Sequence, residues 1–319
     1  MRVGRGDFVY ELDEGWGKLP DGWEYVDVVG VRVDGQDNVY VFNRGPHPVV
    51  VFDQAGALLG SWGEGVFGRP HGLQLDGDDV YCVDDLDHTV RKFTLDGKLR
   101  MTIGTPGQAS QTGWSGSYDT LKGGPPFNRP TNLAVGANGD LYVSDGYGNC
   151  RTHRFSPTGE LIQSWGAAGT GPGQFRLPHG ACAEPEGTVL IGDRMNGRVQ
   201  RFSPTGEYID EWSDVRQPDD IYRDADGNYY VAELGHLDGA TPTTLGARVT
   251  VRDRAGRVLS AFGDEGDATR PGNMASPHGI CVDSRGNLFV GEVTYTSRIS
   301  RGILPAGTHV FQRFERVAR

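Results

Sequence analysis

Short runs in which apolar and polar residues alternate recur from one end of the chain to the other. Each run is interrupted by a turn such as Asp-Gly, and the run after the turn is rich in aromatic and β-branched residues. Alternation with period two, punctuated by such turns, predicts antiparallel strands joined by tight hairpins. Six copies of this plan are present, at residues 31–45, 73–85, 133–146, 181–194, 221–234 and 280–293.

Most copies are followed by a third strand, a turn and a fourth strand, at residues 49–63, 90–104, 153–166, 199–213 and 249–263. A four-stranded unit of about 40–50 residues that is repeated six times is typical of propeller blades. We therefore predict an all-β fold, a six-bladed β-propeller of four-stranded antiparallel blades that forms one domain over residues 1–319. The predicted blades cover approximately residues 21–63, 64–104, 127–166, 174–213, 214–263 and 276–319 plus 8–17.

The sixth copy lacks a clear fourth strand. Residues 8–17 end in Trp16-Gly17, the pair that closes other blades, so we expect the N-terminal strand to join the last blade and close the ring. Such a closure leaves no unpaired inner edge. Two longer excursions, residues 105–126 and 235–247, interrupt the period, and loops of this kind often carry function.

Composition narrows the possible partners. The chain carries a net charge of −11 and has no concentrated Lys/Arg stripe, which argues against a nucleic-acid partner. No window approaches the ~18–20 apolar residues of a membrane span, and the start lacks the apolar stretch of a secretory signal. The four cysteines are scattered and form no C-x-x-C pair, so a reducing cytoplasm is the simplest expectation.

Histidine occupies the same place in alternate blades. At the start of the innermost strand, Pro is followed by His71, His179 and His278 in blades two, four and six, and by Thr131 and Asp219 in blades three and five. Three imidazoles pointing at one axis, with one coordination position open, describe a catalytic zinc site. The alternative is that Pro-His-Gly is only a strand-entry turn, but the other two residues show that the fold does not require histidine there.

The sequence resembles the peptidyl-α-hydroxyglycine α-amidating lyase family, which consists of six-bladed propellers related to NHL-repeat proteins. The resemblance covers nearly the whole chain and is most specific in residues 67–76, 127–151, 173–180, 192–202 and 276–283. It implies zinc bound by the three histidines, Tyr147 of the DGYGN segment as the base, and Arg44 and Arg194 as active-site arginines.

The repeats point to the same arginines. When the six repeats are aligned, the position at the end of the second strand is acidic or amide in every blade, so we interpret it as a structural turn cap. This column consists of Asn43, Asp84, Asp145, Asp193, Glu233 and Glu292. The next column varies, as Arg44, Asp85, Gly146, Arg194, Leu234 and Val293, so the fold leaves it free for chemistry. The alternatives are that each arginine is a solvated surface residue and that Tyr147 is a packed aromatic residue.

The chain departs from the family pattern at three positions. Gly279 stands where the family has an Asp that helps to bind a structural calcium, and Ser276 replaces a methionine, which argues against calcium in the channel. Gly148 replaces a disulfide-bonded cysteine. Four histidines outside the alternate-blade set, His47, His88, His153 and His236, are expected at the surface or in turns. Cys182 and Cys281 are expected to pack within strands.

The resemblance implies cleavage of a carbinolamide, with zinc polarising the substrate hydroxyl and the tyrosine removing its proton. A tyrosine has an unperturbed pKa of about 10, so this role requires nearby positive charge. An arginine could also pair with a substrate carboxylate. We expect a small hydroxylated substrate that can carry a carboxylate. A zinc-assisted hydrolase on the same site and a non-catalytic NHL-type binding module are the two alternatives.

Overall fold

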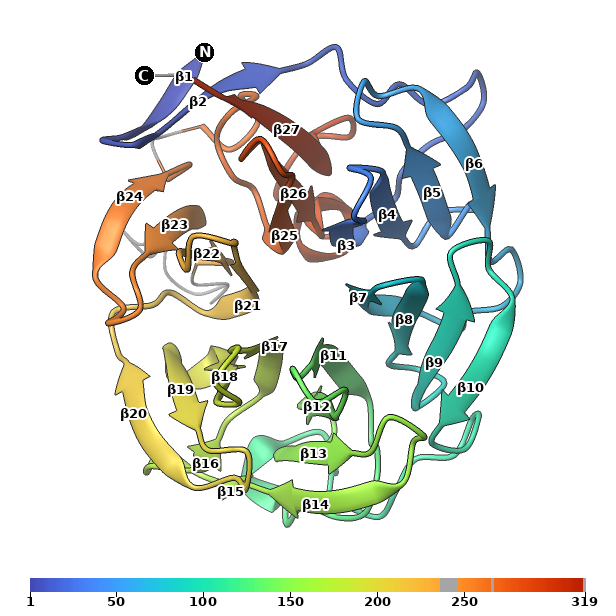
Figure 1. Ribbon diagram of the computed structural model, residues 1–319, viewed down its shortest axis with the longest axis vertical. Coiled ribbons are helices and arrows are strands. Elements are labelled where there is room, and N and C mark those ends of the chain that lie inside the picture. The colour runs from blue at the N-terminus through green and yellow to red at the C-terminus, as the bar shows by residue number, and fades with distance from the viewer. Residues whose placement is uncertain (236–245, 265–266, 318–319) are drawn as a thin grey trace. The chain divides into compact units, whose positions relative to one another are not determined.

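A computed structural model describes residues 1–235, 246–264 and 267–317. Its small antiparallel sheets, shown with their strand labels in Figure 1, confirm the predicted six-bladed β-propeller. The second predicted excursion, with His236, lies almost entirely outside the described residues. None of the described helices is long and apolar enough to cross a membrane. The chain divides into two compact units, residues 65–218 and residues 1–64 with 219–319.

The unit of residues 65–218 contains three four-stranded sheets. The first has β7 (Pro70–Asp76), β8 (Asp79–Asp84), β9 (Thr89–Thr94) and β10 (Leu99–Ile103). The second has β11 (Pro130–Val135), β12 (Leu141–Asp145), β13 (Arg151–Phe155) and β14 (Leu161–Trp165). The third has β17 (Pro178–Ala183), β18 (Val189–Asp193), β19 (Arg198–Phe202) and β20 (Tyr208–Trp212). The sequence pattern did not predict the short parallel pair β15 (Ala167–Ala168) and β16 (Gln174–Phe175) or the 3-10 turns η1 (Tyr118–Thr120) and η2 (Arg194–Asn196).

The other unit contains the remaining three sheets. One has β3 (Val28–Val33), β4 (Val39–Asn43), β5 (Val49–Phe52) and β6 (Leu58–Trp62). The next has β21 (Pro218–Arg223), β22 (Tyr229–Glu233), β23 (Arg248–Arg252) and β24 (Val258–Phe262). The last joins β25 (Pro277–Val282), β26 (Leu288–Glu292) and β27 (Phe311–Arg316) to β2 (Phe8–Asp13) and β1 (Arg2–Arg5). A single π-helical turn, η3 (Tyr295–Ile299), follows β26.

The last sheet confirms that the N-terminus joins the final blade, with one difference in its extent. Strand β2 pairs with β27, and the short strand β1 then pairs with β2, so this blade has five strands rather than four. The predicted outer strand ends at Asp13. Trp16 lies beyond it and packs against Phe289, with ring centroids 5.0 Å apart. The Trp-Gly pair of the N-terminus therefore closes the blade through aromatic packing, and not as part of a strand.

In four blades, the acidic residue at the end of the second strand accepts hydrogen bonds from the loop that leads into the first strand. The Asp84 carboxylate accepts hydrogen bonds from the backbone N–H groups of Gly68, Arg69 and Asp87 at 2.6–3.0 Å. Asp193 and Glu292 accept equivalent bonds from Arg176 and from Ala275. A charged acceptor on backbone donors strengthens each contact. These caps hold the strand entries on which the predicted histidines stand.

Replacing Tyr10 tests how much the N-terminal strands stabilise the last blade. The Tyr10 ring is fully buried among Phe262, Val3 and neighbouring residues, and its hydroxyl lies 3.3 Å from that of Tyr230. We expect Tyr10→Ala to lower the free energy of unfolding by ~3–5 kcal/mol, and Tyr10→Phe by ~1 kcal/mol. Urea denaturation measures both changes. Glu11→Ala on the exposed face of β2 is the control, and an equal loss in this variant would contradict the packing argument.

Candidate functional site

His71 and His179 are buried in the unit of residues 65–218, each as the second residue of a first strand. The Nδ1 atom of His71 lies 2.6 Å from the carbonyl oxygen of Thr131. Because a carbonyl can only accept a hydrogen bond, Nδ1 must carry the proton, and Nε2 is the nitrogen with the lone pair. The two imidazole rings lie with their centroids 4.9 Å apart. The structure therefore brings two of the predicted ligands together.

The Tyr147 hydroxyl lies between these two histidines. Its oxygen is 3.0 Å from Nε2 of His71 and 3.3 Å from Nε2 of His179. Arg194 donates to the same oxygen from Nη1 at 3.3 Å. A phenol has one proton to donate, so it cannot satisfy two imidazole lone pairs at once. The Tyr147 hydroxyl thus lies within hydrogen-bond distance of both histidines and of Arg194.

Hydrogen bonds to the loop before β11 and to the end of β12 hold the turn that carries Tyr147. The backbone N–H of Gly148 donates to Asn128 at 3.0 Å, and the Asn149 amide donates to the cap residue Asp145 at 2.7 Å. A Cβ atom at Gly148 would lie only 2.3 Å from the Asn128 side-chain oxygen. The position therefore requires glycine, which gives a packing reason for the departure from the family's cysteine.

The first predicted excursion packs beside this turn. The hydroxyl of Thr112 donates to the carbonyl of Gly148 and accepts from the Asn128 amide at 3.0 Å. Further along, Trp114 and Tyr118 lie with ring centroids 5.3 Å apart. Burial raises the pKa of Tyr118 to about 12, and the Arg194 charge opposes this shift. The excursion thus places two aromatic rings in the same region as Arg194.

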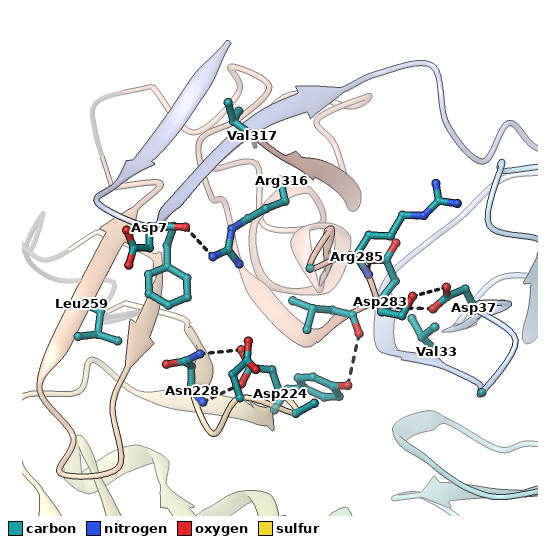
Figure 2. Close-up of a pocket in the computed structure, with 18 of the residues that line it drawn as sticks. Asp7, Val33, Asp37, Asp224, Asn228, Leu259, Asp283, Arg285, Arg316 and Val317 are labelled. Atoms are coloured by element: carbon teal, nitrogen blue, oxygen red, sulfur yellow. Dashed lines mark hydrogen bonds between the residues drawn. The ribbon is translucent and has the colours of Figure 1, made fainter. Parts of the chain in front are cut away.

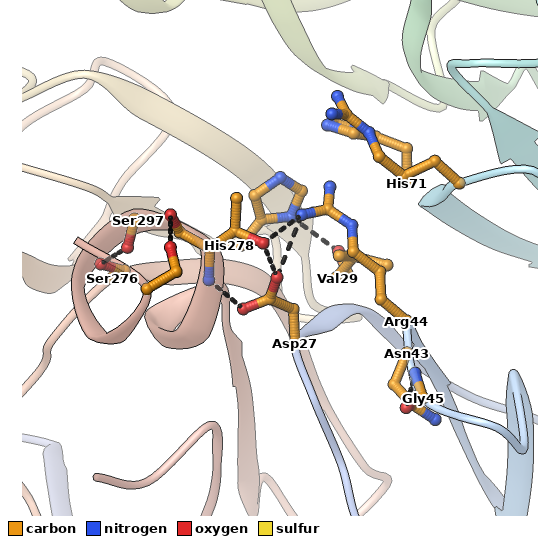
Figure 3. A network of polar contacts seen from close by, with 12 residues as sticks. Asp27, Val29, Asn43, Arg44, Gly45, His71, Ser276, His278 and Ser297 are labelled. Atoms are coloured by element: carbon orange, nitrogen blue, oxygen red, sulfur yellow. Dashed lines mark hydrogen bonds and ion pairs between the residues drawn. The ribbon is translucent and has the colours of Figure 1, made fainter. Parts of the chain in front are cut away.

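The unit formed by residues 1–64 and 219–319 carries His278, the second residue of β25. It is buried, and its Nδ1 lies 2.7 Å from the carbonyl oxygen of Val29, as Figure 3 shows. Its Nε2 is therefore the lone-pair nitrogen, as in His71. The next residue, Gly279, lies so close to β3 that a Cβ would be 2.8 Å from the Cα of Gly30. An aspartate at this position would require β3 and β25 to shift.

Arg44 belongs to the same unit and is paired with a carboxylate that the sequence did not identify. Its Nη1 lies 3.2 Å from Oδ2 of the fully buried Asp27 and 3.4 Å from the hydroxyl of Thr296 (Figure 3). Thr296 also donates its backbone N–H to Asp27 at 3.1 Å. The Arg44 side chain is only 11% exposed, so the surface alternative is wrong for this arginine.

Within the described ranges, the three predicted ligands His71, His179 and His278 each present a buried imidazole, the first two in one unit and the third in the other. In His71 and His278, Nδ1–H donates to a backbone carbonyl and Nε2 is left as the ligand atom. Metal-binding histidines usually have such a hydrogen bond on the nitrogen that does not bind the metal. The residues therefore fit a metal, and the donor atoms would be imidazole nitrogens.

Three charged residues near Tyr147 were missed by the sequence analysis. The guanidinium carbons of Arg69 and Arg129 lie 5.7 Å and 5.5 Å from the centre of the Tyr147 ring. Both arginines pair with Asp85, whose side chain is fully buried. Burial lowers the pKa of the Arg69 guanidinium, but the hydrogen bonds that it donates to Asp85 and the negative charges around it, that of Asp85 first, together outweigh burial and raise this pKa. Asp85 was detectable, because it stands in the variable column with Arg44 and Arg194.

The remaining histidines give one correction. His153 was expected at the surface or in a turn, but it is fully buried on β13, with Nδ1 2.7 Å from the Ser164 hydroxyl and Nε2 3.5 Å from Asp145. The turn residue His88 accepts the backbone N–H of Arg129 at 3.0 Å. The adjacent residue Thr152 is also fully buried, so both faces of β13 are covered at this point and alternation alone does not place His153.

A separate pocket of about 970 Å³ lies among the turns of the unit that contains His278, and none of the predicted site residues lines it (Figure 2). It is rich in carboxylates, but these groups serve their own turns. Asp224 accepts from Asn228, and Asp283 accepts from Asn287, each from backbone and side chain at 2.7–2.9 Å. Asp224 and Asp283 are therefore structural caps.

The fold is a six-bladed propeller, and the unit of residues 65–218 carries a polar cluster of two histidines, a tyrosine and an arginine. No protein-family model matches the chain. It is 32% identical over 203 residues to "Peptidyl-glycine alpha-amidating monooxygenase A" of Xenopus laevis, covering 54% of this chain and 21% of that protein. It is 37% identical over 156 residues to "Peptidyl-alpha-hydroxyglycine alpha-amidating lyase 1" of Drosophila melanogaster, covering 45% and 27%.

The human "NHL repeat-containing protein 3" is 31% identical over 203 residues, covering 60% of this chain and 55% of that protein. The chain thus spans between about a fifth and just over half of these relatives. A solved structure of streptogramin B lyase shares the fold, with a TM-score of 0.57 at 13% identity over 97% of this chain and 86% of the other. The curated relatives confirm the resemblance to amidating lyases and NHL-repeat proteins, and the amidating lyases among them suggest an enzyme. The solved structure supports the fold alone.

Metal analysis of purified variants tests the histidine cluster. We expect the protein to bind about one equivalent of metal, and His71→Ala or His179→Ala to lower this content several-fold, because each removes an imidazole ligand. Elemental analysis after extensive dialysis measures the content. His47→Ala, which removes a histidine paired with Glu64 at the surface, is the control. Equal metal content in all variants would refute the site.

Proposed function

We propose that this protein is a zinc-dependent lyase that cleaves the C–N bond of a small carbinolamide, an α-hydroxylated amide. The observation that carries the proposal is the Tyr147 hydroxyl, which lies 3.0 Å from a histidine Nε2 and 3.3 Å from an arginine donor. A group that is to move a proton must lie within such reach of its partners. The lyases among the relatives add support.

His71, His179 and His278 are the residues that we propose as the zinc ligands. Three imidazole nitrogens with an open position suit zinc in a catalytic role. Zinc bound there would polarise the hydroxyl oxygen of the substrate. We infer zinc from the nature of these donors and from the resemblance, and we do not include calcium.

In the proposed reaction the oxygen of Tyr147 takes the proton of the substrate hydroxyl. The electron pair of that O–H bond becomes the second bond of a carbonyl group, and the C–N pair leaves with the amide nitrogen, which takes up a proton. The products are an amide and an aldehyde, or glyoxylate when the substrate is an α-hydroxyglycine derivative. Arg194 favours the negative oxygen by donating to it.

Arg44 is proposed to assist from the unit that contains His278. Its pairing with buried Asp27 holds the guanidinium in one position. A guanidinium held in place in this way loses less side-chain entropy when it binds an anion. We propose that Arg44 orients the substrate without taking part in proton transfer.

Replacing Tyr147 tests the lyase. We expect Tyr147→Phe to reduce glyoxylate release from N-butyryl-α-hydroxyglycine by about 10²–10⁴-fold, because the base is lost. Metal content should stay the same, because the three histidines remain. Tyr208→Phe, on the exposed face of β20, is the matched control and should retain full activity.

Two other results would replace the proposal. Turnover of an ester or lactone that survives Tyr147→Phe, without release of glyoxylate, would indicate a zinc-dependent hydrolase on the same histidines. A protein that binds no metal and turns over neither substrate class would be a non-catalytic NHL-type binding module.

A further inference from the structure

Arg69 and Arg129 occupy a position that the fold leaves free. Both precede the proline at the start of a first strand, and the same position holds Leu177, Gln217 and Ser276 in later blades. The backbone does not select arginine there either, since Leu177 and Gln217 share the positive φ of Arg129, at 86°, 51° and 67°. The two guanidinium groups are therefore not required by the blade.

One buried carboxylate serves both arginines. Asp85 accepts from Nε of Arg69 at 2.7 Å and from its Nη2, whereas Nη2 of Arg129 lies 3.5 Å away. A single negative charge cannot balance two positive ones, and Arg194 adds a third beside Tyr147. The chain as a whole is acidic, at −11, so this concentration of positive charge is local.

Both arginines keep donors that the protein does not use. Asp85 engages two of the five N–H groups of Arg69. Among the described residues, the Nε of Arg129 is buried and has no hydrogen-bond partner. Each side chain is 28% exposed, so a ligand can reach it. Buried donors in proteins normally have an acceptor, so a bound ligand that supplies one would be favoured. Carboxylates are strong acceptors for guanidinium groups.

We propose that Arg69 and Arg129, linked through Asp85, form an anion-binding subsite beside Tyr147 that selects substrates with a carboxylate. The ligands chosen for the test rest on the proposed function. A carboxylate in such a substrate could stand on the glycine portion or on the acyl portion of the amide, and the probes below separate the two.

Three stable glycine analogues, which lack the hydroxyl and cannot react, provide the test by titration calorimetry. N-butyrylglycine carries the charge on the glycine portion, N-succinylglycinamide carries it on the acyl portion, and N-butyrylglycinamide is neutral. We expect the protein to bind at least one acid about tenfold more tightly than the neutral analogue, because charge-assisted hydrogen bonds form only with the acids.

The variants assign that preference to the arginines. Arg129→Gln should abolish it and leave the Arg69–Asp85 pair intact, and glutamine suits the backbone because Gln217 fills the equivalent position. Arg69→Gln should do the same. Arg129→Lys should keep part of the preference. Arg100→Gln, which removes a half-exposed arginine paired with Asp79, is the control and should keep all of it.

Equal binding of the acids and the neutral analogue would overturn the subsite, as would a preference that survives both glutamine variants. Variants that keep the preference but lose turnover would show that the arginines only position Tyr147, which also overturns it. One pair of results would separate the two proposals. If the wild-type protein releases no glyoxylate from N-butyryl-α-hydroxyglycine, and if the Arg129→Gln variant loses the preference for acids that the wild type shows, then the proposed lyase fails and the subsite stands.

Discussion

The site depends on one kind of hydrogen bond, from histidine Nδ1 to the backbone carbonyl of the neighbouring blade's first strand. His71 on β7 donates to Thr131 on β11, and His278 on β25 donates to Val29 on β3. Each bond fixes the tautomer and the ring plane at once. The same contact links adjacent blades, so the spacing of the sheets and the direction of Nε2 are set together.

The carboxylate caps make this arrangement possible. Asp84 accepts from two backbone donors of the loop before β7, Gly68 and Arg69, and Glu292 holds the loop before β25 in the same way. Without them, the strand entries that carry the histidines would expose unpaired N–H groups. The second strand of each blade thus determines where the first strand begins, and the variable residue after the cap is free to hold Arg44, Asp85 or Arg194.

Much of this could be predicted from sequence because the repeat supplies internal comparisons. The strands, the closure by the N-terminus and the alternate-blade histidines all follow from comparing equivalent positions. Strand β1 was missed because Arg2–Arg5 is too short and too polar to show a pattern. The partners of the arginines were missed because pairs such as Asp27 with Arg44 and Asp85 with Arg129 join separate strand ends. Periodicity predicts which face of a strand a side chain lies on, but it does not predict which side chains contact each other past the ends of the strands.

The five-stranded last blade also has a consequence for how the chain folds. Asp13 on β2 and Arg313 on β27 form an ion pair although they are 300 residues apart in sequence. Strand β2 is therefore synthesised about 300 residues before the strand with which it pairs. The entropy cost of closing so long a loop grows only logarithmically with length, but contacts at this separation slow folding. Until β27 has been synthesised, the edge of β2 that pairs with it stays open to other chains.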